Sequence, residues 1–404
     1  MTSIIGEYLK YAHYYENEFG HKTVVLLMVG AFYEMYGLRS DDAIIGSAIQ
    51  DVTSLCGLHI SDKQFSHEGK QVVIAGFRDY TKERYIEQLV AHDYTCVVYD
   101  QYVDSDGKIK RKFSNTYSPG TTFKSEHSSL SNYCGVLWFH HWKQDITIGC
   151  AVIDVCTGNT HLYEPSVPYY PMPSTFDDLE RFLSIYCPSE LICISNSTAF
   201  DVHTLILQLY HNHCKLHIIR LKPLNDDASS DSAIRDKFIE KAMNCEKQCY
   251  INTMIETFYK TCNTHIFREL FLQHTIATQA LCYLLDFIDT HNPDLISNLK
   301  EPKYETMQGF LLLANHSLQQ LNIIEPNRHA QKPHNGPRCV LDILDKCKTS
   351  MGSRELQHAL LHPTCDTEYL NVLYGVTSRG LKEPDAVMQM RNMLGSIVDL
   401  EKMT

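Results

Sequence analysis

The sequence predicts a chain of mixed class, with two α/β parts followed by an all-α part. Over about the first 120 residues, short apolar runs alternate with amphipathic stretches. Hairpin-like runs and a second strand–helix alternation follow, as far as about residue 220. Beyond about residue 235, apolar residues recur at helical spacing almost without interruption. The 404 residues are enough for two or three domains of ordinary size.

The first α/β part is predicted over residues 1–123. Helical spacing of apolar residues indicates a helix over 3–19. The stretch TVVLLMVGAFYEMYG at 23–37 indicates a buried strand, a turn at its glycine and an aromatic cluster. The other elements expected here are strands over 71–77 and 94–103, an amphipathic helix over 81–93, and a segment over 109–123 that closes in a Pro-Gly turn.

The second part is predicted over residues 124–235 and the helical third part over 236–404. A polar, turn-rich stretch at 223–233 indicates a surface loop or linker between them. In the third part, residues 267–288 are strongly apolar on one face. The elements expected in the second part are strands over 134–139, 146–158, 159–164, 190–195 and 215–221, and helices over 176–186 and 200–210.

Composition excludes some classes of protein. A formal net charge of −12 argues against a non-specific nucleic-acid coat protein, although a local positive field could still bind DNA. The 15 cysteines show no disulfide framework, and the first residues carry no secretory pattern. No apolar run approaches the roughly 18 residues that span a membrane. These features predict an intracellular protein that does not enter a membrane.

Metal and catalytic motifs are weak or absent from the sequence. HNHC at 211–214 and the pair Cys245/Cys249 could suggest zinc, but no matched CxxC pair accompanies them, which favours ordinary thiols. The chain has no Gly-x-x-x-x-Gly-Lys-Ser/Thr motif and no readable Ser-His-Asp or paired-carboxylate arrangement. We therefore predict no catalytic residue, no metal ligand and no cofactor within this chain.

Four segments, taken in order, resemble the MutS family of DNA mismatch repair proteins. They are VVLLMVGAFYEMYG at 24–37, IAGFRDYTKERYIEQLVAHDYTCVVYDQ at 74–101, KRKFSNTYSPGTTF at 110–123 and LDILDKCKTSMGSRELQHALLHPTCD at 341–366. IDVCTGNTHLYE at 153–164 and IVDLEKM at 397–403 are also similar to the family. The chain departs from the family's usual residues at Met28, Ala31 and Arg78, where Arg, Asp and Pro are common.

The resemblance implies three domains. They are a mixed α/β mismatch-recognition domain over 1–123, an RNase H-like α/β connector domain over 124–235, and an incomplete helical core or lever domain over 236–404. The family's ATPase domain and DNA clamp would lie beyond Thr404, so ATP and Mg are expected only with that domain. The resemblance also implies mismatched double-stranded DNA as ligand, a homo- or heterodimer at full length, and mismatch-repair proteins as partners. The cytoplasm, the nucleus, an organelle or a virus would each be a suitable setting.

The resemblance assigns mismatch binding to Phe32 and Glu34. A mismatch weakens stacking, so an apolar ring can be wedged into the base stack from the minor groove. Residues two apart in an extended segment share a face, so Phe32 and Glu34 can point at the same base while Tyr33 faces inward. A glutamate there can accept from a base N–H, or donate if protonated. Tyr33 and Tyr36 are expected to be core residues.

A basic run lies further along the first part. Lys108, Lys110, Arg111 and Lys112 form a cluster on the strand expected near residue 110, and Arg78 follows another expected strand. Such a run is either a solvated face or a set of phosphate contacts, and both readings stay open.

Two functions from different classes are compatible with these observations. The first is a DNA-binding module that starts mismatch repair. The alternative is a MutS-like interaction protein that lacks ATPase activity and binds protein partners through its connector domain. Retention of Phe32 and Glu34 favours the first function, and the absence of a P-loop would favour the second if 404 residues were the mature length.

Overall fold

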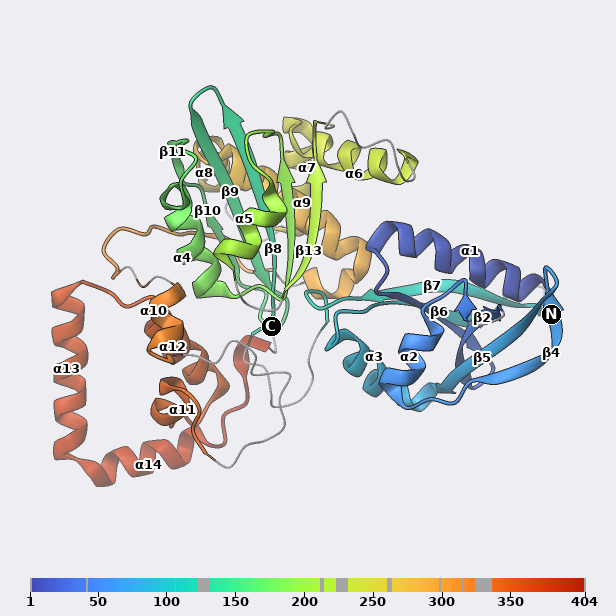
Figure 1. Cartoon of the computed structure of the whole chain (residues 1–404). Coiled ribbons are helices and arrows are strands. Elements are labelled where there is room, and N and C mark those ends of the chain that lie inside the picture. The colour runs from blue at the N-terminus through green and yellow to red at the C-terminus, as the bar shows by residue number, and fades with distance from the viewer. Residues whose placement is uncertain are drawn as a thin grey trace. The chain divides into compact units, whose positions relative to one another are not determined.

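The computed structural model describes residues 2–40, 43–105, 107–122, 131–210, 214–222, 232–259, 264–297, 299–311, 313, 315–323 and 336–402 (Figure 1). The chain forms two compact units: residues 1–122, 227–240 and 286–295 make the first, and the remaining residues make the second. This division differs from the three predicted domains (1–123, 124–235 and 236–404), which remain a prediction.

The first unit is built on one mixed sheet whose strand order is β4-β5-β2-β1-β6-β7, with β3 paired to β2. The central strands β1 and β6 run parallel, and the other pairs are antiparallel. The strands are β1 (Thr23–Val29), β2 (Phe32–Arg39), β3 (Ile44–Ile45), β4 (Ser61–His67), β5 (Lys70–Arg78), β6 (Thr95–Val103) and β7 (Ile109–Tyr117).

Helices cover both faces of this sheet (Figure 1). Helix α1 (Thr2–Phe19) lies on one face, where the ring of Tyr8 meets Tyr36 of β2 edge-on at 5.2 Å between centroids. Helices α2 (Ile49–Cys56) and α3 (Lys82–Val90) lie on the other face, where Phe77 of β5 stacks on Tyr85 at 4.4 Å. Because both faces are covered, β1 and the middle of β2 read as nearly continuous apolar runs.

The second unit contains a sheet of order β13-β12-β8-β9-β10-β14, with β11 paired to β9. Five main strands are numbered one to five in chain order: β8, β9, β10, β12 and β13. Across the sheet they lie in the order three-two-one-four-five. Strand two is antiparallel to strand one and the other three are parallel to it, as an RNase H-like sheet requires. The strands are β8 (Tyr133–Trp142), β9 (Asp145–Asp154), β10 (Thr160–Tyr163), β11 (Ser166–Pro168), β12 (Glu190–Ser195), β13 (Lys215–Arg220) and β14 (Lys303–Tyr304).

Helices make up most of the rest of the described chain after β8. Helix α9 (Thr275–His291) begins directly on β9: a Cβ added to Gly149 would lie 2.3 Å from the Ile276 carbonyl oxygen, so only glycine allows this approach. The other helices are α4 (Asp177–Tyr186), α5 (Val202–Leu209), α6 (Ser232–Cys245), α7 (Gln248–Phe258), α8 (Thr264–Gln273), α10 (Asn315–Gln320), α11 (Val340–Leu344), α12 (Ser350–Leu361), α13 (Thr367–Lys382) and α14 (Pro384–Leu394).

The predicted fold class, α/β followed by all-α, is confirmed. Within the region expected to be helical, the short strand β14 departs from the pattern by extending the sheet edge beside β10. Among the described residues, no helix is both long enough and apolar enough to cross a membrane.

Two segments singled out in the sequence, 341–366 and 397–403, are joined by a buried ion pair. The Arg354 side chain, on α12, is only 9% exposed. Its guanidinium donates to both carboxylate oxygens of Asp399, at 2.6 and 2.7 Å, and to Glu401 at 2.8 Å. The planar fork of arginine matches a carboxylate in this two-bond geometry, so the contact fixes the end of the described chain against α12.

Replacing Arg354 with Gln should lower the free energy of unfolding at neutral pH by on the order of 2 kcal/mol, because charged hydrogen bonds are lost. Arg354 holds the pKa of Asp399 below its ordinary value. Its contribution is therefore present above the unfolded-state pKa of about 4 and is lost as the pH falls through the folded-state pKa. Thermal unfolding from pH 7 toward pH 2 checks this, since the midpoint difference between variant and native chain should shrink in acid.

Arg391→Gln is the matched control for this experiment. Arg391 donates at 2.7 Å to the backbone carbonyl of Lys346, which does not titrate. Its midpoint difference should not depend on pH in the acid range. A difference for Arg354→Gln that is equally large at both ends of the range would contradict the assignment.

Candidate nucleic-acid interface

The turn between β1 and β2 is held on both sides by neighbouring strands. Gly30 has a φ of +62°, the left-handed conformation that tight hairpin turns need at their first central residue. Its N–H donates to the Gln101 Oε1 of β6 at 2.9 Å. The carbonyl of Ala31 accepts from the Asp79 N–H, just after β5, at 3.0 Å. The turn therefore has a fixed position at one end of the sheet.

Phe32 is the first residue of β2 and has 41% of its surface exposed. It pairs with Arg78, the last residue of β5, whose guanidinium carbon lies 5.7 Å from the centre of the Phe32 ring. An exposed aromatic ring is usually unfavourable in water, and a cation over its face offsets part of that. The Phe32 ring and the Arg78 guanidinium lie together at this end of the sheet, which is called the corner below.

Glu34 lies on the same face as Phe32 and is half-buried. The Tyr36 hydroxyl donates to Glu34 Oε2. Tyr36 itself is buried beneath α1, and burial, followed by the hydrogen bond to Glu34, raises its pKa above the ordinary tyrosine value. The phenol is thus a neutral donor at physiological pH.

Tyr33 lies on the opposite face, as the strand alternation predicted. It is 3% exposed, and its hydroxyl donates to Asp100 Oδ1 at 2.5 Å. The Lys82 ammonium lies 5.4 Å from the centre of its ring. Tyr33 and Tyr36 are both core residues, as expected.

The same alternation divides the predicted basic cluster. Arg111 pairs with Gln101 and lies on the Phe32 face, where its Nε donates to the Met28 carbonyl at 2.9 Å. Lys110 and Lys112 lie on the opposite face and are exposed, and Lys110 is hydrogen-bonded to Asp104. Lys108 is exposed in the turn that precedes β7.

The structure thus brings Phe32, Glu34, Arg78 and Arg111 together on one face at one end of the sheet, and it places the three lysines of the predicted cluster on the other face or in the turn. Exposed apolar side chains that sequence reasoning did not single out surround this end. Tyr80 is 77% exposed directly after β5, and Tyr102 and Ile109 are exposed where β6 and β7 meet. The sequence indication that could have identified Tyr80 is its position, two residues beyond Arg78 in a turn-forming stretch.

No metal site emerges from the described residues. His211, Asn212 and His213, part of the HNHC segment, lie outside them, and Cys245 is buried while Cys249 is exposed. Among the residues that the structure describes, no group of three or more His, Cys, Asp or Glu side chains could hold a metal ion.

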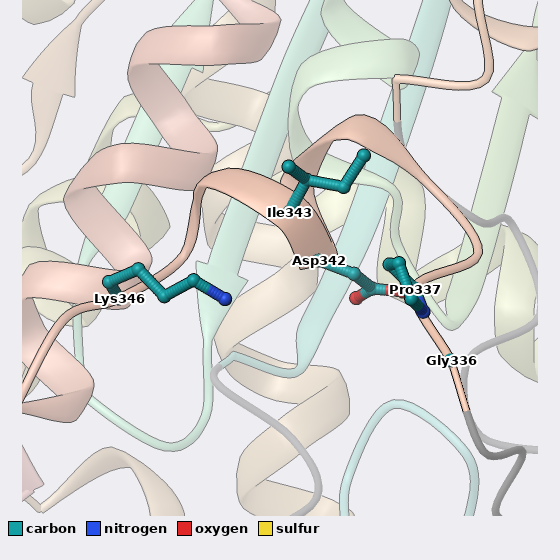
Figure 2. Close-up of a pocket in the computed structure, with 5 residues that line it drawn as sticks. All are labelled: Gly336, Pro337, Asp342, Ile343 and Lys346. Atoms are coloured by element: carbon teal, nitrogen blue, oxygen red, sulfur yellow. The ribbon is translucent and has the colours of Figure 1, made fainter.

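One open pocket belongs to the second unit (Figure 2). Figure 2 shows Asp342, Ile343 and Lys346 spread around the short helix α11, with Gly336 and Pro337 leading into it. Asp342 accepts from the Arg338 N–H at 3.0 Å, a bond that orders the start of this helix. One acid on α11 and one base just after its end do not define a ligand, and we assign none.

The comparisons with known proteins agree with this architecture. Residues 11–126 match the family model of MutS domain I, and residues 316–404 match that of MutS domain III. The chain belongs to the MutS family, which confirms the resemblance seen in the sequence.

Three relatives show the extent of the likeness. A DNA mismatch repair protein MutS homologue of Acanthamoeba polyphaga mimivirus is 24% identical, over 100% of this chain and 36% of the relative. Proteins named DNA mismatch repair protein MutS from Chlorobaculum parvum and Thermotoga maritima are 23% and 22% identical, over 99% and 100% of this chain and 40% and 42% of the relatives. The chain therefore spans roughly two fifths of the length of these curated relatives.

Gly76→Ala should disturb this site through the backbone. A Cβ at Gly76, which pairs with Glu34, would lie 2.5 Å from the Tyr33 carbonyl oxygen, so β2 and β5 must separate. We expect a loss of stability on the order of 1–3 kcal/mol, measured as a shift of the denaturant unfolding midpoint. Gly6→Ala, in α1, is the control, because its Cβ meets only ordinary contacts and should stabilise the helix by about 0.5–1 kcal/mol. A Gly76→Ala chain as stable as the native one would show that the strands do not approach so closely.

Proposed function

We propose that this chain binds mismatched or kinked double-stranded DNA and so starts DNA mismatch repair. Family membership supports the proposal, and the names of the relatives give mismatch repair as their function. The observation that carries it for this chain is the position of an exposed ring, Phe32, and a carboxylate, Glu34, on the same face at one end of the sheet.

The chemistry of this corner suits a wedge. Opening a base step costs a few kcal/mol, and less where pairing is already faulty. The Phe32 ring repays part of that cost by stacking, a contact of about 1–3 kcal/mol that needs no particular base. Glu34 then supplies a directed polar bond to the base beside the ring. Discrimination therefore comes from the ease of opening the stack, with the carboxylate selecting how the displaced base is held.

Positive charge near the corner offsets the repulsion between Glu34 and the phosphates. Arg78 and Arg111 share its face, and the exposed Lys108 lies in the turn that precedes β7. A chain with net charge −12 can bind DNA in this way only through such a local field. These contacts position the duplex and carry no base information.

A second function is favoured by one observation in the second unit. Trp142, Tyr170 and Met172 are all exposed, and the Tyr169 N–H donates to the Gln144 carbonyl at 2.7 Å, which brings their two segments together. Exposed aromatic and methionine side chains are typical of protein interfaces. Binding of a protein partner through this unit is thus the alternative, and a chain without mismatch preference would favour it.

Further properties implied by the family remain proposals for this protein. They are dimerisation, association with other mismatch-repair proteins, an intracellular or viral setting, and a dependence on ATP and Mg where an ATPase domain accompanies these domains. A relative from a mimivirus supports the viral setting.

Phe32→Ala should remove the preference for a mismatch and leave most non-specific binding in place. The ring acts only where the stack can open, whereas phosphate contacts act everywhere. Loss of a stacking contact of about 1–3 kcal/mol corresponds to roughly tenfold or more in discrimination. Competition titrations with matched and G·T duplexes at fixed salt measure the ratio of the two affinities. Full mismatch preference in Phe32→Ala would exclude the wedge.

In the same assay, Glu34→Ala should lower the mismatch preference while matched-duplex affinity stays level or rises, because a negative charge is removed.

The double variant Lys108→Ala/Lys112→Ala should weaken binding to matched and mismatched duplexes about equally. If each lysine contacts one phosphate, the slope of log affinity against log salt should become shallower by about two. Lys70→Ala is the control, since Lys70 lies at the opposite end of the sheet, beside His67. An unchanged slope in the double variant would mean that these lysines face away from the DNA.

A further inference from the structure

We propose that Tyr36 is a positioning residue for Glu34. The Tyr36 hydroxyl holds one oxygen of the Glu34 carboxylate, so that the other oxygen faces the base beside the Phe32 ring. The inference rests on the proposed function and deepens it. The sequence pattern marked Tyr36 only as core, and the comparisons give it no role.

The bond runs along the strand from the core to the DNA-facing end. Tyr36 and Glu34 are two residues apart and share the α1 face of β2. Tyr36 is 5% exposed, whereas Glu34 is half-buried, and the Tyr36 hydroxyl donates to Glu34 Oε2. The Tyr36 hydroxyl thus links a side chain fixed in the core to the Glu34 side chain at the edge of the core.

The donor is itself fixed from two directions. The ring of Tyr8, on α1, packs edge-on against Tyr36 at 5.2 Å. The backbone carbonyl of Tyr36 accepts from Ser47 Oγ at 2.6 Å. A recognition side chain held by a packed neighbour loses less conformational freedom on binding than one that is free in solvent.

The chemistry of the pair is asymmetric. Burial and the bond to Glu34 raise the pKa of Tyr36, so the phenol keeps its proton and acts as a donor. Arg111, on the same face, opposes that shift through its positive charge. With Oε2 engaged, Oε1 has its acceptor positions available for a base N–H. An undirected carboxylate would meet mainly phosphate repulsion, so its orientation decides whether Glu34 helps or hinders binding.

The neighbouring residue provides a matched control. The hydroxyl of Tyr33 also donates to a carboxylate, Asp100, at 2.5 Å, and Tyr33 is just as buried, but it lies on the opposite face. Tyr33→Phe and Tyr36→Phe therefore remove the same group from two positions of one strand, one on each face. Only Tyr36→Phe should affect Glu34.

Competition titrations with matched and G·T duplexes should be run on the native chain, Tyr36→Phe, Tyr33→Phe, Phe32→Ala, Glu34→Ala and the double variant Glu34→Ala/Tyr36→Phe. Tyr36→Phe should lower the mismatch preference about fivefold, the equivalent of one hydrogen bond, without changing matched-duplex affinity. Tyr33→Phe should keep the native preference. Adding Tyr36→Phe to Glu34→Ala should have no further effect, because the hydroxyl acts only through the carboxylate.

The outcomes separate this inference from the proposed function. A native chain without mismatch preference overturns both. Loss of preference in Phe32→Ala with full preference in Tyr36→Phe overturns the positioning role alone, as does an equal loss in Tyr33→Phe or an additive double variant.

A measurement without DNA tests the contact directly. A buried, hydrogen-bonded hydroxyl proton exchanges slowly with water and gives a resolved NMR resonance. The Tyr36 resonance should be present in the native chain, absent in Tyr36→Phe, and lost or shifted in Glu34→Ala. A resonance unchanged by Glu34→Ala would show that the hydroxyl has another partner and would overturn the proposal.

Discussion

The site of the first unit depends on the parallel pairing of β1 with β6, which joins segments about 70 residues apart. In this register Leu27 lies opposite Tyr99, so the turn that follows β1 meets the end of β6, and Gln101 can accept from Gly30. The antiparallel return of β7 then brings Arg111 alongside. The pairing of β2 with β5 adds Arg78 from the other side. The parallel pair in the middle of the sheet and the antiparallel pairs on either side of it thus bring parts of five strands to one place.

The charges at this corner must work against the charge of the whole chain. A net charge of −12 repels DNA at long range, and Glu34 adds to that repulsion at short range. Arg78 and Arg111 are each tied to the corner by a second contact, with the Phe32 ring and with the Met28 carbonyl respectively. Their charge is therefore held where it opposes that of Glu34, which a mobile surface lysine would do less well.

Much of this could be predicted from the sequence, for identifiable reasons. The apolar run before Gly30 and the period of two in β2 predicted a buried strand, a turn, and the opposite orientations of Phe32 and Tyr33. The order of the strands in the sheet could not be derived, because pairing is decided by contacts distant in sequence. For that reason the position of the Arg78 guanidinium beside the Phe32 ring was not predicted. The Tyr36–Glu34 bond lies within one strand, where the period of two places both side chains on one face but does not decide that they bond.

Two further differences have local causes. The same period of two that separated Phe32 from Tyr33 also separates Arg111 from its lysine neighbours, so a run of basic residues is not one surface. Strand β14 has two residues and therefore no periodicity of its own, and it exists because β10 offers an open edge. The class of each long element follows from its own pattern, whereas short edge strands follow from their neighbours.

The turn at Gly30 has a consequence for how this region can change over generations. It contains two residues, and its length sets the register of everything in β2. One inserted residue would send Phe32 and Glu34 to the face now occupied by Tyr33, and would move Tyr33 to the outside. An exchange of residue type leaves the register intact, but an insertion or deletion does not. The hairpin can therefore diverge widely in sequence while its length stays constant. Its evolutionary history should consist of substitutions, without insertions or deletions.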